Sequence, residues 1–392
     1  MSAALPSVII AGYGCVSPLG IGREETVQSL RTSRDSISPV RLFAVEGCQC
    51  RSAGQVDESL TERASAIARK TRRWTRSAQM VACALDEALR TRPGFRPDCI
   101  VIGTTSGGMS RGEDFMRAMI RKEGEVSTAR RIRDYVPHQP ILQAMRLFGF
   151  NAPVRVISNA CASGSNALGV ARQLIRHGHA RRVLAGGYDS LAELVFAGFD
   201  CLRAATPEKC RPFDEKRSGL CLGEGAAMFC LEAEEHDIGI RLAGYGSAFD
   251  AHHLTQPHPS GRGPRIAMER ALADAGFEAS RIDYVNAHGT GTPLNDSSEG
   301  RAILDVCPQA PVSSTKSMMG HSLGAAGAIE AAICTMALEE GFLPANINFR
   351  QGEADLPLDI IANEIRPTIP RTVISNSFGF GGSNASIILS TP

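Results

Sequence analysis

The chain has 392 residues, of which 43% are hydrophobic and 21% are charged, proportions that are ordinary for a globular protein. Lys and Arg number 42 against 41 Asp and Glu, so the net charge gives no reason to expect nucleic acid or a membrane surface as the main partner. No apolar run reaches the roughly 18 residues of a membrane-spanning helix, and the N-terminal residues lack the regions of a signal peptide. The 12 cysteines include no C-x-x-C pair, which argues against a zinc ribbon or a disulfide scaffold and favours the reducing cytoplasm.

Taken in chain order, the predicted elements repeat once. Residues 8–14 and 240–246 are apolar strands that close on the same Ala-Gly-Tyr-Gly sequence. A helix, a strand with a Gly- and Thr-rich turn, a strand-to-helix unit and a final strand then follow in each half. The paired segments are 77–90 with 265–275, 100–108 with 284–292, 154–175 with 312–321 and the helix after it, and 226–231 with 385–389. This alternation predicts an α/β protein with largely buried sheets, made of two halves, 1–235 and 236–392.

Three segments lie outside the repeat. Residues 63–76 form a basic run on a predicted helix, which is typical of a solvated face. Residues 111–140 alternate charged and apolar positions and close on two prolines, which predicts an inserted helical segment. Residues 204–221 are rich in Gly and Pro and are predicted to form a long surface loop.

Cys161 stands where a predicted buried strand, 154–157, turns into a predicted helix that starts at Ala162. The helix dipole and the free N–H groups of its first turn favour a thiolate there, and the thiolate is the nucleophile. The alternative is a buried cysteine that acts as a small hydrophobe, the expected state of most cysteines in this chain. Position at a strand-to-helix corner is consistent with either reading.

Two histidines lie in Gly-rich turns at predicted strand ends, His288 in Asn-Ala-His-Gly-Thr-Gly-Thr and His321 in Ser-Met-Met-Gly-His. Ligands gather at the carboxyl ends of strands in open α/β sheets. Cys161 and His321 occupy corresponding helix entries in the two halves, so a pseudo-twofold arrangement would bring the three side chains to one site. One cysteine and two histidines suit covalent thiol chemistry on a carbonyl group.

Glu330 is the one charge in the predicted helix 322–338, and Lys316 is its natural partner because a buried carboxylate needs one. Neither a complete dinucleotide-binding glycine motif nor a P-loop occurs, so no nucleotide cofactor is expected. Residues 378–384, Phe-Gly-Phe-Gly-Gly-Ser-Asn, follow a predicted strand and form a turn whose N–H groups can approach an oxyanion.

Four motifs in order resemble those of the β-ketoacyl-acyl carrier protein synthases of the thiolase superfamily. They are Asn-Ala-Cys161-Ala-Ser-Gly, Asn-Ala-His288-Gly-Thr-Gly-Thr, Ser-Thr-Lys316-Ser-Met-Met-Gly-His321 and Asn-Ser-Phe-Gly-Phe-Gly-Gly-Ser-Asn384. The similarity runs from Val8 to Leu389. The Cys-His-His pattern resembles the elongating enzymes, whereas the initiating type uses Cys-His-Asn and the thiolases use a second cysteine.

The resemblance implies a thiolase-like five-layer αβαβα fold from two related halves, a dimer, and no metal or cofactor beyond the phosphopantetheine arm of acyl carrier protein. Cys161 would carry the acyl chain, and His288 and His321 would stabilise the enolate formed as malonyl thioester loses carbon dioxide. The remaining matches are residues of the oxyanion site, the acyl gate, the charged pair and the pantetheine channel. They are Cys161, Phe380 and Phe378 for the oxyanion and gate, Lys316 with Glu330 orienting His321, and Thr290 with Thr292 contacting pantetheine.

The resemblance also assigns a docking surface for the acidic carrier protein. Its residues are Arg69, Arg72, Arg73, Arg130 and Arg203. Ser106 stands where housekeeping elongation enzymes often carry a bulky aliphatic residue in the acyl pocket, so the resemblance leaves two pathways open, fatty-acid synthesis and a specialised polyketide or polyene pathway. The partner is then a second identical subunit or a cysteine-less homologue. Two alternatives stay open, a Cys-His thioesterase on the same scaffold and a non-catalytic subunit that sets chain length.

Overall fold

The structure is a computed structural model that describes residues 5–121, 132–234 and 238–392. Its main strands fall into two sets of five with the same spatial order and the same directions. The first set is β1 (Ser7–Ser17), β9 (Gly225–Glu234), β7 (Arg182–Asp189), β5 (Cys99–Gly103) and β6 (Val154–Ile157), and the second is β10 (Arg241–Phe249), β14 (Ser383–Ser390), β13 (Thr372–Gly379), β11 (Tyr284–Asn286) and β12 (Val312–Ser313). The sets meet where Ile9 of β1 pairs with Arg241 of β10.

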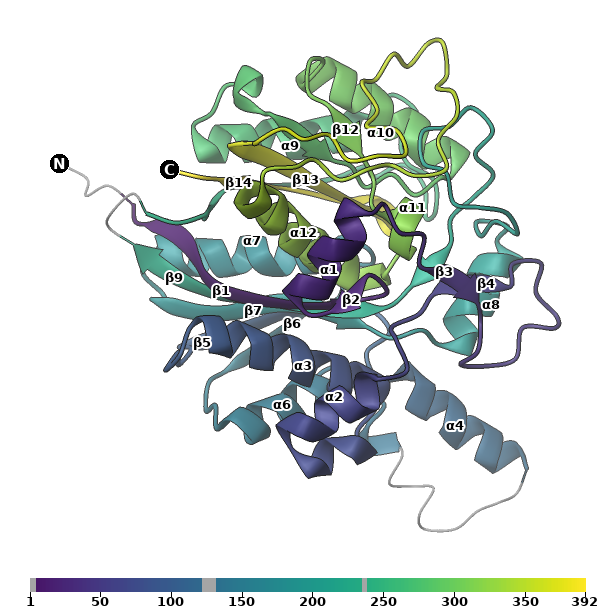
Figure 1. Ribbon diagram of the computed structural model, residues 1–392, viewed down its shortest axis with the longest axis vertical. Coiled ribbons are helices and arrows are strands. Elements are labelled where there is room, and N and C mark those ends of the chain that lie inside the picture. Colours follow the sequence, from purple (N-terminus) through teal and green to yellow (C-terminus); the bar gives the residue numbers. More distant parts are fainter. Residues whose placement is uncertain (1–4, 122–131, 235–237) are drawn as a thin grey trace.

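Helices complete the five layers (Figure 1). α7 (Ser163–Arg176) and α12 (Ala326–Glu340) lie between the two sets of strands and pack on both. The outer layers are α2 (Leu60–Ile67), α3 (Arg76–Thr91) and α6 (Gln139–Phe148) on the first set, and α9 (Arg262–Ala275) and α10 (Pro293–Val306) on the second. The predicted thiolase-like five-layer αβαβα fold is therefore confirmed.

Helix α12 is almost wholly apolar because both of its faces are covered. Residues 326–338 of α12 are all buried, as expected for a helix without a polar stripe. In α7, a Cβ atom on Gly169 would come within 2.2 Å of the Tyr245 ring, so only glycine fits this contact. Arg172 of α7 donates to the carbonyl of Leu242 and pairs with Asp274 of α9, which fixes the central layer to the second half.

Shorter elements connect the layers. They are α1 (Arg23–Arg31), α4 (Met109–Ile120), α8 (Glu193–Cys201), α11 (Lys316–Met319), β2 (Gly20–Ile21), β3 (Ile37–Pro39), β4 (Ser52–Gly54), β8 (Leu222–Gly223) and the 3-10 turns η1 (Arg69–Arg73), η2 (Ala279–Arg281), η3 (Leu323–Ala325) and η4 (Phe380–Gly382). No helix in the described ranges combines the length and apolar character needed to cross a membrane.

Several predicted elements differ in the structure. β6 is not buried: within the part of the chain that the structure describes it is an edge strand paired with β5 alone, and Val156 is 38% exposed. The single helix predicted over 63–76 is broken at Ala68, whose extended backbone separates α2 from η1. The helix predicted from Ser322 begins as η3, because Leu323 adopts a positive φ of 54°.

Two further segments depart in part from the prediction. Residues 204–221 do form a loop, but about half of them are buried, and Phe213 of this loop belongs to a hydrophobic core of the second half. The predicted insertion 111–140 contains most of α4, which begins two residues earlier, and the start of α6, while 122–131 lie outside the described residues. The predicted boundary between 235 and 236 also lies outside them and stays a prediction.

Candidate active site

Cys161 occupies a strained corner between β6 and α7. Ala160 before it has a φ of 54°, a conformation that side chains other than glycine rarely adopt. The Ser163 hydroxyl holds this corner, since it donates to the Ala160 carbonyl at 2.6 Å and accepts from the Asn159 N–H at 2.9 Å. The corner displays the Cys161 thiol at the start of α7 while leaving the residue only 7% exposed.

Burial decides the protonation of this thiol. Loss of solvation raises the pKa of Cys161 to about 11. The charge of Lys316 and the backbone N–H groups of Phe380 and Cys161 lower this pKa, but by less than burial raises it. The expectation that the helix start favours a thiolate is thus wrong for the free protein. The physical reason is that desolvation of the sulfur exceeds the stabilisation by nearby dipoles and charge.

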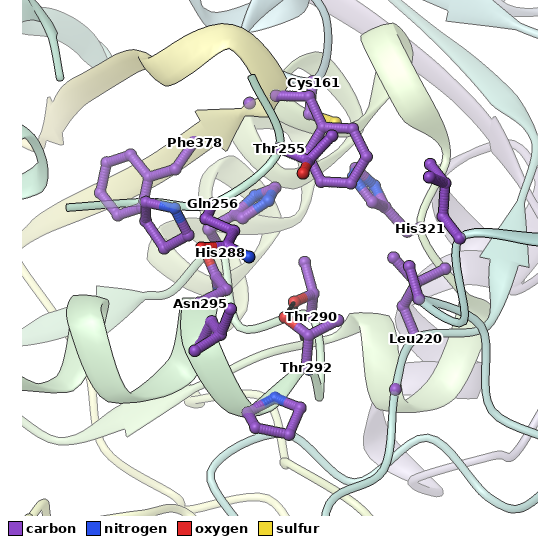
Figure 2. Close-up of a pocket in the computed structure, with 18 of the residues that line it drawn as sticks. Cys161, Leu220, Thr255, Gln256, His288, Thr290, Thr292, Asn295, His321 and Phe378 are labelled. Carbon is purple, nitrogen blue, oxygen red and sulfur yellow. Dashed lines mark hydrogen bonds between the residues drawn. The ribbon is translucent and has the colours of Figure 1, made fainter. Parts of the chain in front are cut away.

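Both predicted histidines lie next to this thiol (Figure 2). The Cys161 sulfur and one ring nitrogen from each of His288 and His321 all lie within 4.8 Å of one another. The two imidazole rings are nearly perpendicular, at 84°, with centroids 5.1 Å apart. In the described residues no hydrogen-bond partner meets Nδ1 of His288 or either ring nitrogen of His321, so these atoms are free to face a ligand.

The histidines are held neutral. Burial lowers the pKa of each imidazole well below its usual value, and the positive charge of Lys316 lowers it further. A neutral imidazole keeps one N–H donor and one acceptor nitrogen. At neutral pH the pair can therefore donate hydrogen bonds to an oxygen without bringing a net charge into the site.

His288 is positioned by two buried carboxylates of α10. Glu299 accepts the N–H groups of His288 at 2.8 Å and Gly289 at 2.7 Å, and burial raises its pKa to about 7. Asp296 lies one helical turn before Glu299 and accepts hydrogen bonds from the N–H groups of Thr290 and Gly291. Sequence reasoning missed both acids, although their spacing of three residues in the first turns of a helix after the Gly-Thr-Gly loop was a signal.

His321 is positioned through its backbone. Its N–H donates to the Cys221 carbonyl at 2.7 Å, and its carbonyl accepts from Gly223 at 2.8 Å, so it lies alongside β8. Gly320 before it has a φ of 77°, and a Cβ atom there would come within 2.4 Å of the Leu222 carbonyl oxygen. The Met-Gly-His turn therefore requires glycine at this position.

Lys316 and Glu330 form a fully buried ion pair behind the histidines. Burial raises the pKa of Glu330 to about 7, and the Lys316 ammonium opposes this shift. None of the hydrogen bonds in the described residues joins this pair to His321. Its influence on the imidazoles is electrostatic, through the charge of Lys316.

The Phe378–Asn384 turn reaches the nucleophile from β13. A Cβ atom on Gly379 would lie 3.0 Å from the Cys161 nitrogen, so glycine allows the close approach of the two backbones. The Phe380 N–H lies close enough to the Cys161 sulfur to lower its pKa. The Phe380 ring stacks on Phe199 of α8 at 5.4 Å, and the Phe378 ring lies 5.9 Å from the His288 ring.

Two cavities meet at this point. The first, of about 370 Å³, contains the histidines, Thr290 and Thr292, whose hydroxyls are 2.9 Å apart, and has Arg203 in its lining. The second, of about 210 Å³, is mostly apolar and includes Ser106. Cys161, Phe199 and Phe380 line both cavities. The thiol thus lies at the junction of the chamber that holds the histidines and threonines and a smaller one that is almost wholly apolar.

The predicted docking residues lie on the surface in part. Arg69, Arg72 and Arg73 of η1 are exposed, with Lys70 between them, and the described residues provide no ion-pair partner for any of the four. Arg203 is also exposed, and it lines the first cavity. Arg130 lies outside the described residues.

The same Cys-His-His group is, within the described residues, the one cluster whose spacing could hold a metal ion. The sequence-based prediction of no metal stays a prediction.

All 12 cysteines are free, and ten of them are buried.

Comparison with known proteins accounts for this arrangement. The model of the beta-ketoacyl synthase N-terminal domain matches residues 6–237, and that of the C-terminal domain matches residues 240–350. The chain is 35% identical to 3-oxoacyl-acyl-carrier-protein synthase 2 of Coxiella burnetii, covering 98% of each chain, and 33% identical to the protein of that name from Synechocystis, covering 97% of each. The structure is similar to that of the ishigamide ketosynthase/chain length factor, with a TM-score of 0.90 and 31% identity over 99% of this chain and 100% of the other. The chain belongs to the beta-ketoacyl synthase family, which is a family of condensing acyltransferases.

Proposed function

We propose that the chain condenses an acyl group held as a thioester on Cys161 with malonyl-acyl carrier protein, releasing carbon dioxide and 3-oxoacyl-acyl carrier protein. The observation that carries the proposal is the convergence of the Cys161 sulfur with the two imidazoles within 4.8 Å, at the junction of two cavities. Family membership supports the reaction class. Fatty-acid and polyketide or polyene pathways both use this reaction.

In the first step the Cys161 sulfur attacks the carbonyl carbon of the acyl thioester. The N–H groups of Cys161 and Phe380 stabilise the oxyanion, and the pantetheine thiol leaves. Since the resting thiol has a pKa of about 11, it is protonated before the reaction. The proton of Cys161 leaves during attack, by way of a neighbouring imidazole nitrogen, and ends on the departing thiol.

In the second step the malonyl thioester occupies the first cavity. His288 and His321 donate hydrogen bonds to its thioester carbonyl oxygen, where negative charge develops as the carboxylate leaves as carbon dioxide. The resulting enolate carbon attacks the acyl carbonyl on Cys161. The carbon–sulfur bond to Cys161 breaks, and the released thiolate takes a proton from solvent.

The other site residues serve these two steps. Burial keeps both imidazoles neutral, and the charge of Lys316, held in place by Glu330, adds to this effect and orients His321 electrostatically. Thr290 and Thr292 contact the pantetheine arm, which is the carrier of the substrates, and no further cofactor takes part. Phe380, with Phe378 beside it, gates the passage from the first cavity to the second, where the acyl chain lies against Ser106.

The exposed arginines of η1, with Arg130 and Arg203, form the docking surface for an acidic carrier protein. A second ketosynthase-like subunit, identical or homologous, covers the edge strand β6 and the apolar groove of about 620 Å³ between α4 and α8. Met109 lines both this groove and the acyl cavity. The free cysteines support a reducing compartment, which we take to be the cytoplasm.

The test is incubation of the protein with acyl- and malonyl-loaded carrier proteins, followed by mass spectrometry of the carriers. We expect a 3-oxoacyl product extended by two carbons and one equivalent of carbon dioxide. Free acid without extension would instead indicate a thioesterase. A protein that leaves every carrier unchanged, with or without a ketosynthase-like partner, would contradict the proposal.

A further inference from the structure

Asp189, the last residue of β7, is a fully buried carboxylate without a cationic partner in the described residues. Its two oxygens accept hydrogen bonds from six donors. The donors are the hydroxyls of Thr104 (2.7 Å) and Thr105 (2.6 Å) and the backbone N–H groups of Thr105 (3.0 Å), Ser106 (2.8 Å), Gly107 (3.0 Å) and Gly324 (2.8 Å). Backbone and hydroxyl dipoles thus replace the solvation that burial removes.

These donors come from two separate segments. Residues 104–107 form the loop after β5, the parallel neighbour of β7, so the carboxyl ends of both strands meet at the same edge of the sheet. Gly324 lies in η3, three residues after His321. A Cβ atom on Gly324 would be 2.9 Å from the Asp189 Oδ2 atom, so the segment approaches the carboxylate only because it has glycine there.

Both segments form walls of the apolar cavity next to Cys161. Thr105 and Ser106 line it from the loop after β5, and Leu323 lines it from η3. Leu323 has a φ of 54°, which is a strained backbone conformation. The hydrogen bond from the N–H group of the next residue, Gly324, to Asp189 helps to hold Leu323 in this conformation in the cavity wall. By contrast, Asp189 itself lines none of the cavities described above.

We propose that Asp189 is a positioning residue that fixes the two walls of the acyl cavity against each other and thereby sets which acyl chains Cys161 accepts. The inference deepens the proposed function and rests on it for the identity of the ligand, an apolar acyl chain. An asparagine at 189 keeps the size of the side chain but replaces an acceptor oxygen by an N–H₂ group. That group faces N–H donors, so some of the bonds are lost and the walls separate.

The test uses alkylation of Cys161 by straight-chain alkyl chloromethyl ketones, because this reaction does not require condensation. The sulfur forms a bond to the methylene carbon, chloride leaves, and the thiol proton passes to solvent. A cavity of about 150 Å³ holds benzene, so the 210 Å³ cavity suits a tail of about eight heavy atoms. The measured quantity is the ratio of labelling rates for the octyl and methyl reagents, followed by mass spectrometry of the Cys161 peptide.

We expect the octyl-to-methyl ratio of the full chain to fall at least about tenfold in Asp189→Asn, since misplacement by 1 Å can cost up to about 10²-fold. The methyl reagent should react at the same rate or faster, because the Asp189 charge raises the pKa of Cys161. The matched control is Glu87→Gln, which alters a carboxylate that binds the N–H groups of Cys15 and Arg23 away from the cavities. Its ratio should equal that of the wild type.

An octyl-to-methyl ratio that is the same in Asp189→Asn and in the wild type would overturn the inference. So would an equal fall in the octyl and methyl labelling rates that matches a loss of protein stability. If Asp189→Asn does not fold, Thr104→Val removes one donor, and a smaller fall in the ratio is expected; no fall would again overturn the inference. The two proposals fail separately. A wild type that is labelled with tail selectivity but never acylated by carrier thioesters contradicts the proposed function and leaves the role of Asp189 intact.

Discussion

The two cavities that meet at Cys161 differ in the kind of residue that lines them. The first contains His288, His321 and two threonines and carries the groups that can stabilise negative charge. Among the described residues that line the second, behind Phe380, Cys161 is the one titratable side chain. From this difference we expect reaction and selection to be separated in space. Substitutions in the first cavity should change rates, and substitutions around the second should change which chain is used.

The largest effect is expected where the cavities join. Cys161→Ala should lower condensation by about 10⁶-fold, the size of loss seen when an enzyme nucleophile is removed. Cys201→Ser is the matched control, because Cys201 is an exposed cysteine at the end of α8 and should be dispensable. Assay of the 3-oxoacyl product checks both. A Cys161→Ala protein that retains substantial condensation would contradict the role of the junction.

The buried pair behind the first cavity should affect stability more than selection. Lys316→Met removes the partner of Glu330 and leaves an unpaired carboxyl group in the core, and breaking a buried pair in this way typically costs about 3–5 kcal/mol. The double variant Lys316→Met/Glu330→Leu should recover most of this loss in free energy of unfolding, measured by urea denaturation, while condensation stays impaired. If the single and double variants are equally destabilised, the pair is not the source of the effect.

Histidine substitutions should separate the two steps of the reaction. His288→Ala or His321→Ala removes one donor from the enolate oxygen and should slow decarboxylation by on the order of 10²–10³-fold. Acylation of Cys161 should fall less, because its oxyanion is bound by backbone N–H groups and the remaining imidazole can still carry the thiol proton. Release of labelled carbon dioxide and the mass of the acyl-enzyme measure the two steps. Equal losses in both would remove the distinction between the cavities.

The pH dependence of thiol reactivity should follow the burial of Cys161. With a pKa of about 11, the thiolate fraction increases about tenfold for each pH unit from 7 to 10. The rate of alkylation of Cys161 by iodoacetamide should rise with the same slope. A rate that levels off below pH 9 would mean that the helix start outweighs desolvation, as the sequence alone suggested.

The smallest effect is expected at the surface. Reversing Arg72 and Arg73 to Glu should raise the KM for carrier-bound substrate roughly three- to tenfold and leave a small thioester analogue unaffected, because exposed charges contribute little each. Arg371→Glu, an exposed arginine before β13, is the matched control. Equal changes for carrier-bound and small substrates would argue against docking at η1.

Local patterns were sufficient to predict much of this architecture. The helix predicted at 77–90 is α3, and the strand repeat around Ala-Gly-Tyr-Gly marks β1 and β10, because periodicity and repeated turns are local properties. The buried pairing of Lys316 with Glu330 followed from one isolated charge in an apolar helix. The convergence of Cys161 with the two histidines followed from corresponding positions in the halves.

What was missed depends on contacts between distant segments. The pKa of Cys161 is set by how completely the Phe378–Asn384 turn and the second half cover the thiol, which no local pattern contains. The role of Asp189 depends on donors from the loop after β5 and from η3, which are remote in sequence. The exposure of β6 reflects its place at the sheet edge rather than its composition, which is apolar at three of four positions.

The most direct test of the central claim is to locate the acyl group. The protein is treated first with an octanoyl carrier thioester and then with an alkyl chloromethyl ketone, which labels any free thiol. It is then digested, and the masses of its peptides are measured by mass spectrometry. We expect one octanoyl group on the Cys161 peptide and protection of that residue from the alkyl reagent. Octanoyl groups on another cysteine, or a Cys161 that stays fully open to alkylation after every acyl donor, would contradict the account.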